Sequence, residues 1–232
     1  EQLGAGRVGF YRQPVNVGST KNFNTCLQRS TGHLVHILHS DDWVLPGFYD
    51  RVELSVRRHP QVALFATRSF VVDEAGDLNA LSPRVASLEV PSKDVSGFLY
   101  SNQLFTPSVV VRRTFYESAG GFLEQLRHTA DWEMWVRALS TGGGCVINQP
   151  LACYRHFAAN ESNRYARTAE NVRDFLRLRD VFAGRFPEFS VATFNQMAMG
   201  VAAAQAQNFR RLQDIEAAVS NESVCRDLRN EL

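Results

Sequence analysis

Apolar residues in the first two thirds of the chain recur at two spacings, which predicts strands alternating with helices. Short apolar or alternating segments predict strands at residues 7–12, 33–40, 62–66, 69–73, 106–113 and 145–148. The segment 33–40 (HLVHILHS) is interrupted mainly by histidines, which is typical of a strand buried on both faces of an α/β sheet. A polar stretch at 79–97 predicts a long surface loop.

Helices are predicted where apolar positions recur every three or four residues. The first two are expected at about 19–30 and from Pro46, which suits the first position of a helix, to about 59. A third is expected from Asp131 to the glycines at 142–144, with its apolar positions at i, i+3, i+4 and i+7. The mixture of elements predicts the α/β class.

Beyond about residue 168 the pattern is helical only. Val172, Phe175 and Phe182 fall on one face, and a second apolar stretch runs from 191 to 207. Such stripes need a partner surface, either the α/β body or a second subunit. The sequence therefore predicts an α/β domain at 1–165 and a helical C-terminal extension at 166–232.

Composition and charge exclude several classes of protein. Apolar residues make up 44% of the chain, which excludes a disordered chain. A formal net charge of +1 gives no electrostatic reason to expect a nucleic acid partner. No run of about 18 apolar residues predicts a membrane span, and the four cysteines form no Cys-x-x-Cys pair that would suggest a zinc site.

Candidate chemistry is densest where the predicted strand 33–40 ends. His39, Asp41 and Asp42 offer an imidazole and two carboxylates, which are ligands for Mg²⁺ or Mn²⁺, and open α/β sheets bind ligands at such strand ends. The alternative is that the two acids only cap the helix that Pro46 begins.

Two further positions are candidates for a site. Asp131 begins a predicted helix, where the helix dipole favours its ionised form, so the carboxylate is either a proton acceptor or a structural acid. His156 follows a predicted strand, within Tyr154-Arg155-His156, and is either a metal ligand or a surface residue.

Three segments, taken in order, resemble glycosyltransferase family 2, whose members have the A-type nucleotide-sugar glycosyltransferase fold with a Rossmann-like mixed sheet. They are NVGSTKNFNTCLQRSTGHLVHILHSDDWVLPGFYD (16–50), FTPSVVVRRTFYESAGGFLEQLRHTADWEMWVRAL (105–139) and PLACYRHFAANES (150–162). The first resembles the family's metal-motif segment, the second its acceptor-side segment, and the third the loop that closes over the donor. The C-terminal helices lie outside this resemblance.

The resemblance implies an inverting, Mg²⁺- or Mn²⁺-dependent transfer of sugar, and it implies roles for five residues. Asp41 matches the last acid of the Asp-x-Asp motif and is the expected metal ligand, while His39 stands where the first acid is usual. Lys21 takes the place of an arginine that meets the phosphates. Asp131 matches the catalytic base. His156 lies one residue before the position of the family's metal-associated histidine, so it is a second candidate ligand.

The expected partners also follow from the resemblance. They are a nucleotide-sugar donor and a glycan or lipid-linked acceptor, in bacterial polysaccharide or lipopolysaccharide biosynthesis in the cytoplasm. Association with the inner face of the membrane, and a homo-oligomer formed through the C-terminal helices, stay open. The family's first strands, which bind the base and ribose, are not among the 232 residues, so either they lie upstream of residue 1 or the chain cannot hold a nucleotide in the usual way. The second possibility leaves a non-catalytic glycan-binding or assembly module as an alternative. The helical extension leaves another, a subunit-interaction protein with the α/β body as its scaffold.

Overall fold

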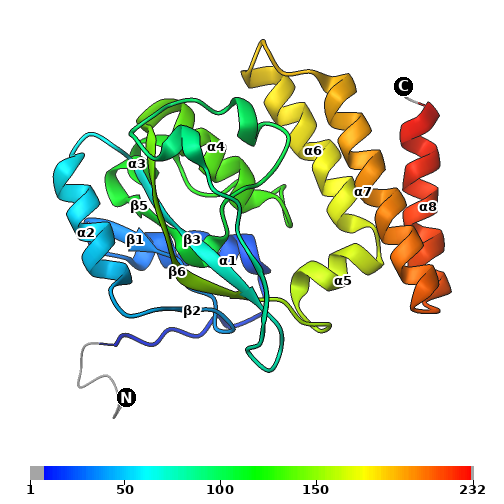
Figure 1. Cartoon of the computed structure of the whole chain (residues 1–232), viewed down its shortest axis with the longest axis horizontal. Helices are drawn as coiled ribbons and strands as arrows, with labels where there is room; N and C mark the ends of the chain where they lie inside the picture. The colour runs from blue at the N-terminus through cyan, green and yellow to red at the C-terminus, as the bar shows by residue number, and fades with distance from the viewer. Residues whose placement is uncertain (1–7, 231–232) are drawn as a thin grey trace.

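The centre of the fold is a six-stranded mixed sheet in the computed structural model, which describes residues 8–230 (Figure 1). The strands are β1 (Leu34–His36), β2 (Trp43–Val44), β3 (Leu64–Val72), β4 (Leu78–Leu81), β5 (Val109–Arg112) and β6 (Gly144–Arg155). Their order is β1-β5-β3-β6-β2, and β4 pairs with β3. Only β3 and β6 run parallel to each other; the other pairs are antiparallel. The predicted α/β class is confirmed.

Helices cover both faces of this sheet. They are α1 (Ser19–Arg29), α2 (Phe48–Arg58), α3 (Arg113–Ala119), α4 (Ala130–Gly142), α5 (Glu161–Arg167), α6 (Glu170–Arg185), α7 (Val191–Arg211) and α8 (Ile215–Asn230). Single turns of 3₁₀ helix lie at Ala86–Leu88, Ser96–Phe98 and Thr106–Ser108. On one face, Phe48 and Val52 of α2 pack on Phe65 of β3. The opposite face is covered by α4, so β3 is buried on both sides, as its continuous apolar sequence requires.

The helices after residue 160 share their core with the sheet. One apolar cluster joins Leu64 of β3 and Trp135 of α4 to Phe182 of α6, Phe194 of α7 and Leu228 of α8. The helical character predicted beyond residue 168 is confirmed, and the apolar stripes pack against the α/β body and each other. The boundary expected at 165/166 falls inside α5. No described helix is long and apolar enough to cross a membrane.

Two predicted strands near the N-terminus differ from the structure. Residue 7 lies outside the described residues, and residues 8–12 form no strand because no neighbouring strand pairs with them; Phe10 is 77% exposed. In the segment 33–40, only the three residues of β1 form a strand, and β1 lies at the edge of the sheet beside β5. The chain then leaves the sheet and forms the irregular segment that carries His39 and Asp41.

The middle of the chain is more regular than predicted. Residues 62–66 and 69–73 belong to the single strand β3, whose pairing with β6 shifts register around Arg68. The expected loop at 79–97 contains most of β4 and buries Leu88 and Val95, so it covers part of the core. In the segment 106–113, a 3₁₀ turn precedes β5.

The last strand is much longer than the predicted 145–148. β6 passes through Pro150 because the register shift opposite Arg68 accommodates a residue without an N–H group. Tyr154 and Arg155, expected in a loop, are therefore the last residues of β6. This extension places the end of β6 beside β2 and the segment that carries Asp41 and Asp42.

Candidate active site

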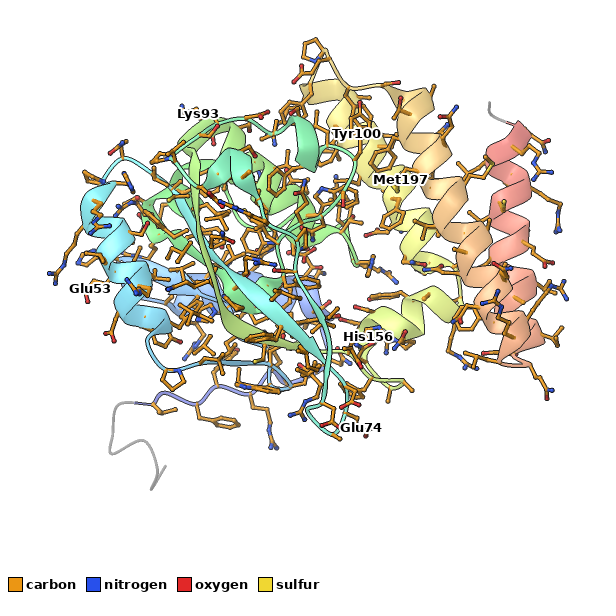
Figure 2. The ribbon with its side chains drawn as sticks, viewed as in Figure 1. Glu53, Glu74, Lys93, Tyr100, His156 and Met197 are labelled. Atoms are coloured by element: carbon orange, nitrogen blue, oxygen red, sulfur yellow. The ribbon has the colours of Figure 1, made fainter. Side chains whose placement is uncertain are left out.

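A cavity of about 820 Å³ lies between the α/β body and the C-terminal helices. His39 and Asp41 line it from the segment after β1, and Asp131 lines it from the first turn of α4. Tyr100 of the body and Met197 of α7, both labelled in Figure 2, line it as well. Two of the predicted site elements, separated by some 90 positions in the sequence, thus share one cavity.

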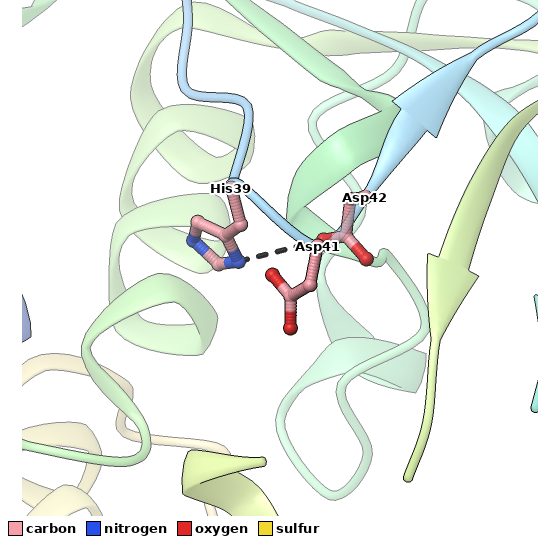
Figure 3. Close-up of side chains that lie close together, drawn as sticks. All are labelled: His39, Asp41 and Asp42. Carbon is pink, nitrogen blue, oxygen red and sulfur yellow. Dashed lines mark ion pairs between the residues drawn. The ribbon is translucent and has the colours of Figure 1, made fainter. Parts of the chain in front are cut away.

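His39, Asp41 and Asp42 form the candidate cation group (Figure 3). Each offers one ligand atom, and these atoms lie within 4.8 Å of one another. The His39 Nδ1 atom lies 3.5 Å from the Asp42 Oδ2 atom, which is longer than a good hydrogen bond. The Asp42 side chain is 1% exposed. In the described part of the chain, its Oδ2 atom and His39 Nε2 have no hydrogen-bond partner.

Neighbouring elements hold this group in place. The Arg155 N–H at the end of β6 donates a hydrogen bond of 2.9 Å to Asp42 Oδ1. The His39 ring stacks on Phe23 of α1, with 5.3 Å between the ring centroids. A buried carboxylate oxygen without a donor is costly unless a cation meets it. The donor set therefore fits a hard divalent ion such as Mg²⁺ or Mn²⁺.

The charges around His39 favour its protonated form. Burial alone lowers the pKa of His39, but the nearby carboxylates, led by Asp42, outweigh burial and raise this pKa above its usual value. A cation bound by the group would replace the proton as the partner of Asp42, so proton release would accompany cation binding.

Asp131 is fixed by three hydrogen bonds. Its Oδ1 accepts the N–H of Trp132 at 2.7 Å, and its Oδ2 accepts the Thr106 hydroxyl at 3.1 Å and the Asn102 side-chain amide at 3.3 Å. Thr106 lies in the 3₁₀ turn that precedes β5, so the sheet and α4 together orient the carboxylate. Such fixed orientation is what a proton acceptor needs.

Burial raises the pKa of Asp131 above the usual value for a carboxyl group, although the charge of His128 and the hydrogen bonds from Trp132 and Thr106 oppose this rise. Burial also lowers the pKa of His128, which favours the neutral imidazole. A raised pKa makes the Asp131 carboxylate a stronger base than an exposed aspartate.

The segment that leads into α4 is bound by Asp174 of α6. Asp174 Oδ2 accepts the backbone N–H groups of Arg127, His128 and Thr129 at 3.0, 2.8 and 2.8 Å. It also accepts the Thr129 hydroxyl at 2.9 Å. Asp174 is fully buried. A side chain of the C-terminal helices thus positions the first turn of α4, and with it Asp131.

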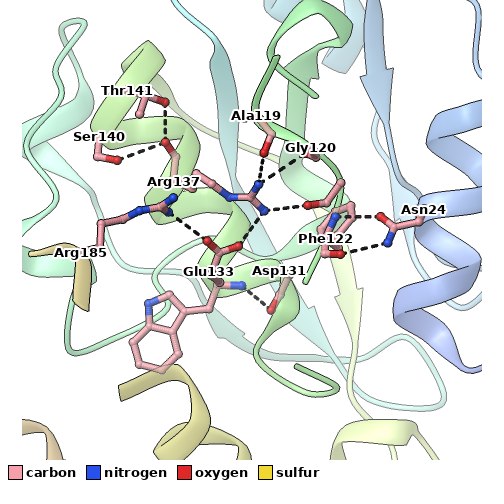
Figure 4. A network of polar contacts seen from close by, with 12 residues as sticks. Asn24, Ala119, Gly120, Phe122, Asp131, Glu133, Arg137, Ser140, Thr141 and Arg185 are labelled. Carbon is pink, nitrogen blue, oxygen red and sulfur yellow. Dashed lines mark hydrogen bonds and ion pairs between the residues drawn. The ribbon is translucent and has the colours of Figure 1, made fainter. Parts of the chain in front are cut away.

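A buried ion pair within α4 connects this helix to its neighbours (Figure 4). Arg137 lies 2.8 Å from Glu133, one turn earlier in α4. It donates hydrogen bonds to the carbonyl of Ala119, the last residue of α3, and to that of Gly121. Arg185 at the end of α6 reaches Glu133 at 3.2 Å. Because Arg137 and Glu133 of α4 together contact the end of α3, the residues after it and α6, the network fixes α4 relative to α3 and α6.

The other predicted site residues lie outside the cavity. Lys21 is an exposed residue of α1, 3.7 Å from Glu124. His156 is exposed just beyond β6 (Figure 2), and its N–H bonds to the carbonyl of Val72. The structure brings neither of them into the group of His39, Asp41 and Asp42. Asp174 carried no sequence signal, because nothing in a helix of mixed charge distinguishes one buried acid.

The chain is similar in sequence to a glycosyltransferase and to an uncharacterized protein. No family model matches the sequence. It is 28% identical over 128 residues to AmsE, the amylovoran biosynthesis glycosyltransferase of Erwinia amylovora, covering 55% of this chain and 46% of AmsE. It is 27% identical over 179 residues to the uncharacterized protein MT1568 of Mycobacterium tuberculosis (strain CDC 1551 / Oshkosh). This match covers 72% of this chain and 56% of MT1568. The chain spans about half the length of these relatives.

Two solved structures show a similar arrangement of elements at low sequence identity. The crystal structure of S. aureus TarS 1-349 superposes with a TM-score of 0.47 and 13% identity, covering 93% of this chain and 72% of TarS. The mannosyltransferase PcManGT from Pyrobaculum calidifontis, solved with GDP-Man and Mn²⁺, superposes with a TM-score of 0.47 and 14% identity. This match covers 92% of this chain and 68% of PcManGT.

Proposed function

We propose that this chain belongs to an inverting, cation-dependent glycosyltransferase of the A-type, family 2, which moves a sugar from a nucleotide-sugar donor to an acceptor hydroxyl. The observation that carries the proposal is the shared cavity, in which His39 and Asp41 of the candidate cation group line the same space as the half-buried Asp131. The similarity to AmsE supports the same class of reaction.

The residues of the cavity suit the chemistry of this transfer. The Asp131 carboxylate accepts the proton of the acceptor hydroxyl. The acceptor oxygen then attacks the anomeric carbon from the face opposite the diphosphate, and the bond between that carbon and the diphosphate oxygen breaks. His39, Asp41 and Asp42 would hold the divalent cation. When bound, Mg²⁺ or Mn²⁺ supplies positive charge against the leaving diphosphate.

Lys21 and His156 keep a place in the proposal as residues at the border of the donor. The pair between Lys21 and Glu124 is exposed, with side chains 57% and 53% accessible, so it is weak and easily exchanged for a phosphate. The exposed His156 would join the donor's diphosphate or its cation when the segment after β6 closes over the donor. Neither role needs Lys21 or His156 to line the cavity.

We further propose a glycan or lipid-linked acceptor and a cytoplasmic role in bacterial polysaccharide or lipopolysaccharide synthesis. In this proposal residues 1–165 form the A-type domain and residues 166–232 the helical extension that completes the acceptor side of the cavity. A non-catalytic glycan-binding module of the same fold is the competing interpretation. It predicts sugar binding without binding of a nucleotide.

The first experiment is a thermal-shift panel of UDP, GDP, dTDP and CMP with and without Mn²⁺. We expect one nucleotide to raise the melting temperature only when Mn²⁺ is present, because a ligand at 100 times its Kd stabilises the native state by about 2.7 kcal/mol. A protein that binds free sugars but none of these nucleotides would support the binding-module interpretation instead.

Replacing Asp41 with alanine is expected to raise the Mn²⁺ concentration needed for nucleotide binding by about tenfold or more, because the cation loses one carboxylate ligand. The measurement is a Mn²⁺ titration at a fixed nucleotide concentration. Asp227→Ala removes an exposed carboxylate of α8, far along the chain from the cation group, and serves as the matched control. An unchanged Mn²⁺ requirement in Asp41→Ala would remove Asp41 from the cation site.

A further inference from the structure

A second cavity, of about 550 Å³, adjoins the candidate active site. Arg127 and Tyr165 line both cavities, so they form the border between them. Three arginines, Arg127, Arg164 and Arg177, line the second cavity. They come from the segment before α4, from α5 and from α6, so elements distant in the sequence bring positive charge to one place.

The acidic residues of this cavity have cationic partners. Glu124 lies 3.7 Å from Lys21, and Glu170 lies 2.8 Å from Arg177. Each carboxylate is therefore paired with a cation other than Arg127.

Arg127 is the arginine left without a carboxylate. Arg164 pairs with Glu161 at 3.0 Å, and Arg177 pairs with Asp174 at 3.0 Å as well as with Glu170. The Arg127 side chain has no ion pair or hydrogen bond to any residue between 8 and 230. Its planar fork of N–H donors is thus free to bind an oxyanion with two hydrogen bonds.

The position of Arg127 links this free charge to the base. The Arg127 N–H is held at 3.0 Å by Asp174, in the same set of hydrogen bonds that fixes His128 and Thr129. The first turn of α4, which carries Asp131, follows directly. A molecule bound through Arg127 would therefore extend from the second cavity toward the Asp131 carboxylate.

We propose that this arginine-lined cavity binds an anionic group of the acceptor, a phosphate or a carboxylate next to the hydroxyl that receives the sugar. The proposal rests on the proposed function and narrows it, because it defines the acceptor as a negatively charged glycan or a phosphate-containing one. Asp131 would stay close to the hydroxyl, while the unpaired guanidinium of Arg127 binds the anionic group of the acceptor.

The test is binding of small anions that carry hydroxyl groups, followed by calorimetry at constant ionic strength and without divalent cations. The probes are glycerol 3-phosphate for a phosphate, glucuronate for a carboxylate, and neutral glycerol. We expect one of the two anions to bind and glycerol not to bind, and the preferred anion identifies the group in the acceptor. Equal or absent binding of all three probes would overturn the proposal.

The variant Arg127→Gln is expected to raise the Kd of the preferred anion by about tenfold, because a hydrogen bond to a charged group is lost. Arg127→Lys keeps the charge but not the fork, so it should bind with an intermediate affinity. Arg57→Gln, on the exposed surface of α2, is the matched control and should bind like the wild type. Wild-type affinity in Arg127→Gln would overturn the proposal.

Failure of this inference and failure of the proposed function give different results. If the wild type binds no nucleotide with Mn²⁺, the transferase assignment fails, whatever the anions do. If nucleotides bind and Arg127→Gln still binds the anions with wild-type affinity, only the proposal of an anionic acceptor fails. Once an acceptor has been identified, kinetics give a further check. Arg127→Gln should raise KM for an anionic acceptor more than it lowers kcat, and KM for a neutral acceptor should not rise.

Discussion

Replacing Asp131 with asparagine is expected to reduce sugar transfer by at least about a hundredfold, because a positioned general base contributes factors of this size and an amide cannot accept the proton. Nucleotide binding should stay near the wild-type value, since the cation group of His39, Asp41 and Asp42 is untouched. The measurements are the initial rate of transfer and the nucleotide Kd in the presence of Mn²⁺. An equal loss in both would contradict the assignment of Asp131 as the base.

The pH dependence of the same reaction gives a second check. Burial raises the pKa of Asp131, and only the ionised carboxylate can accept a proton. The rate should therefore fall as the pH is lowered through this raised pKa, at a pH above that expected for an exposed aspartate. Thr106→Val removes a hydroxyl that bonds to the carboxylate and opposes the rise, so the fall should begin at a higher pH in that variant.

Replacing Asp174 with alanine is expected to cost about 3–5 kcal/mol of folding free energy, because a buried charged network loses its acceptor. The backbone N–H groups of Arg127, His128 and Thr129 would then lack a partner. The start of α4 should loosen, so kcat should fall by about tenfold or more even where the protein is fully folded. Chemical denaturation and steady-state kinetics below the unfolding transition measure the two effects separately.

The matched control for this change is Asp180→Ala on the same helix. The Asp180 side chain is 69% exposed and pairs with Arg179 on the surface, so its loss should change stability by less than about 1 kcal/mol. Asp174→Asn keeps one acceptor oxygen, so its loss of stability should lie between those of Asp174→Ala and Asp180→Ala. If Asp174→Ala lowered stability but left kcat unchanged, Asp174 would support the fold without positioning Asp131.

Helices were predictable here because their signals are local. The apolar positions of α4 and the glycines after it identify Ala130–Gly142 almost to the residue. Pro46, predicted as the first residue of a helix, lies two residues before α2 begins at Phe48. Strand pairing is not a local property. Residues 8–12 alternate like a strand but have no neighbour, whereas β6 continues through Pro150 because a register shift against β3 allows it.

The same distinction holds for the candidate site. The residue types and strand-end position of His39, Asp41 and Asp42 pointed to a cation group, and the structure gathers these three. No local pattern could show that Thr106 and Asn102 bind the Asp131 carboxylate, or that Asp174 binds the segment before it. Those contacts depend on tertiary packing between distant elements, which a single sequence does not display.

The carboxylate of Asp42 belongs to the cation group and to the edge of the sheet at once. Its Oδ2 faces His39, while its Oδ1 holds the N–H of Arg155, next to the short pairing of β2 with β6. Thermodynamic reciprocity then applies. A cation that favours this orientation of Asp42 reduces fraying of the sheet edge, and any fraying of that edge weakens the affinity for the cation by the same factor.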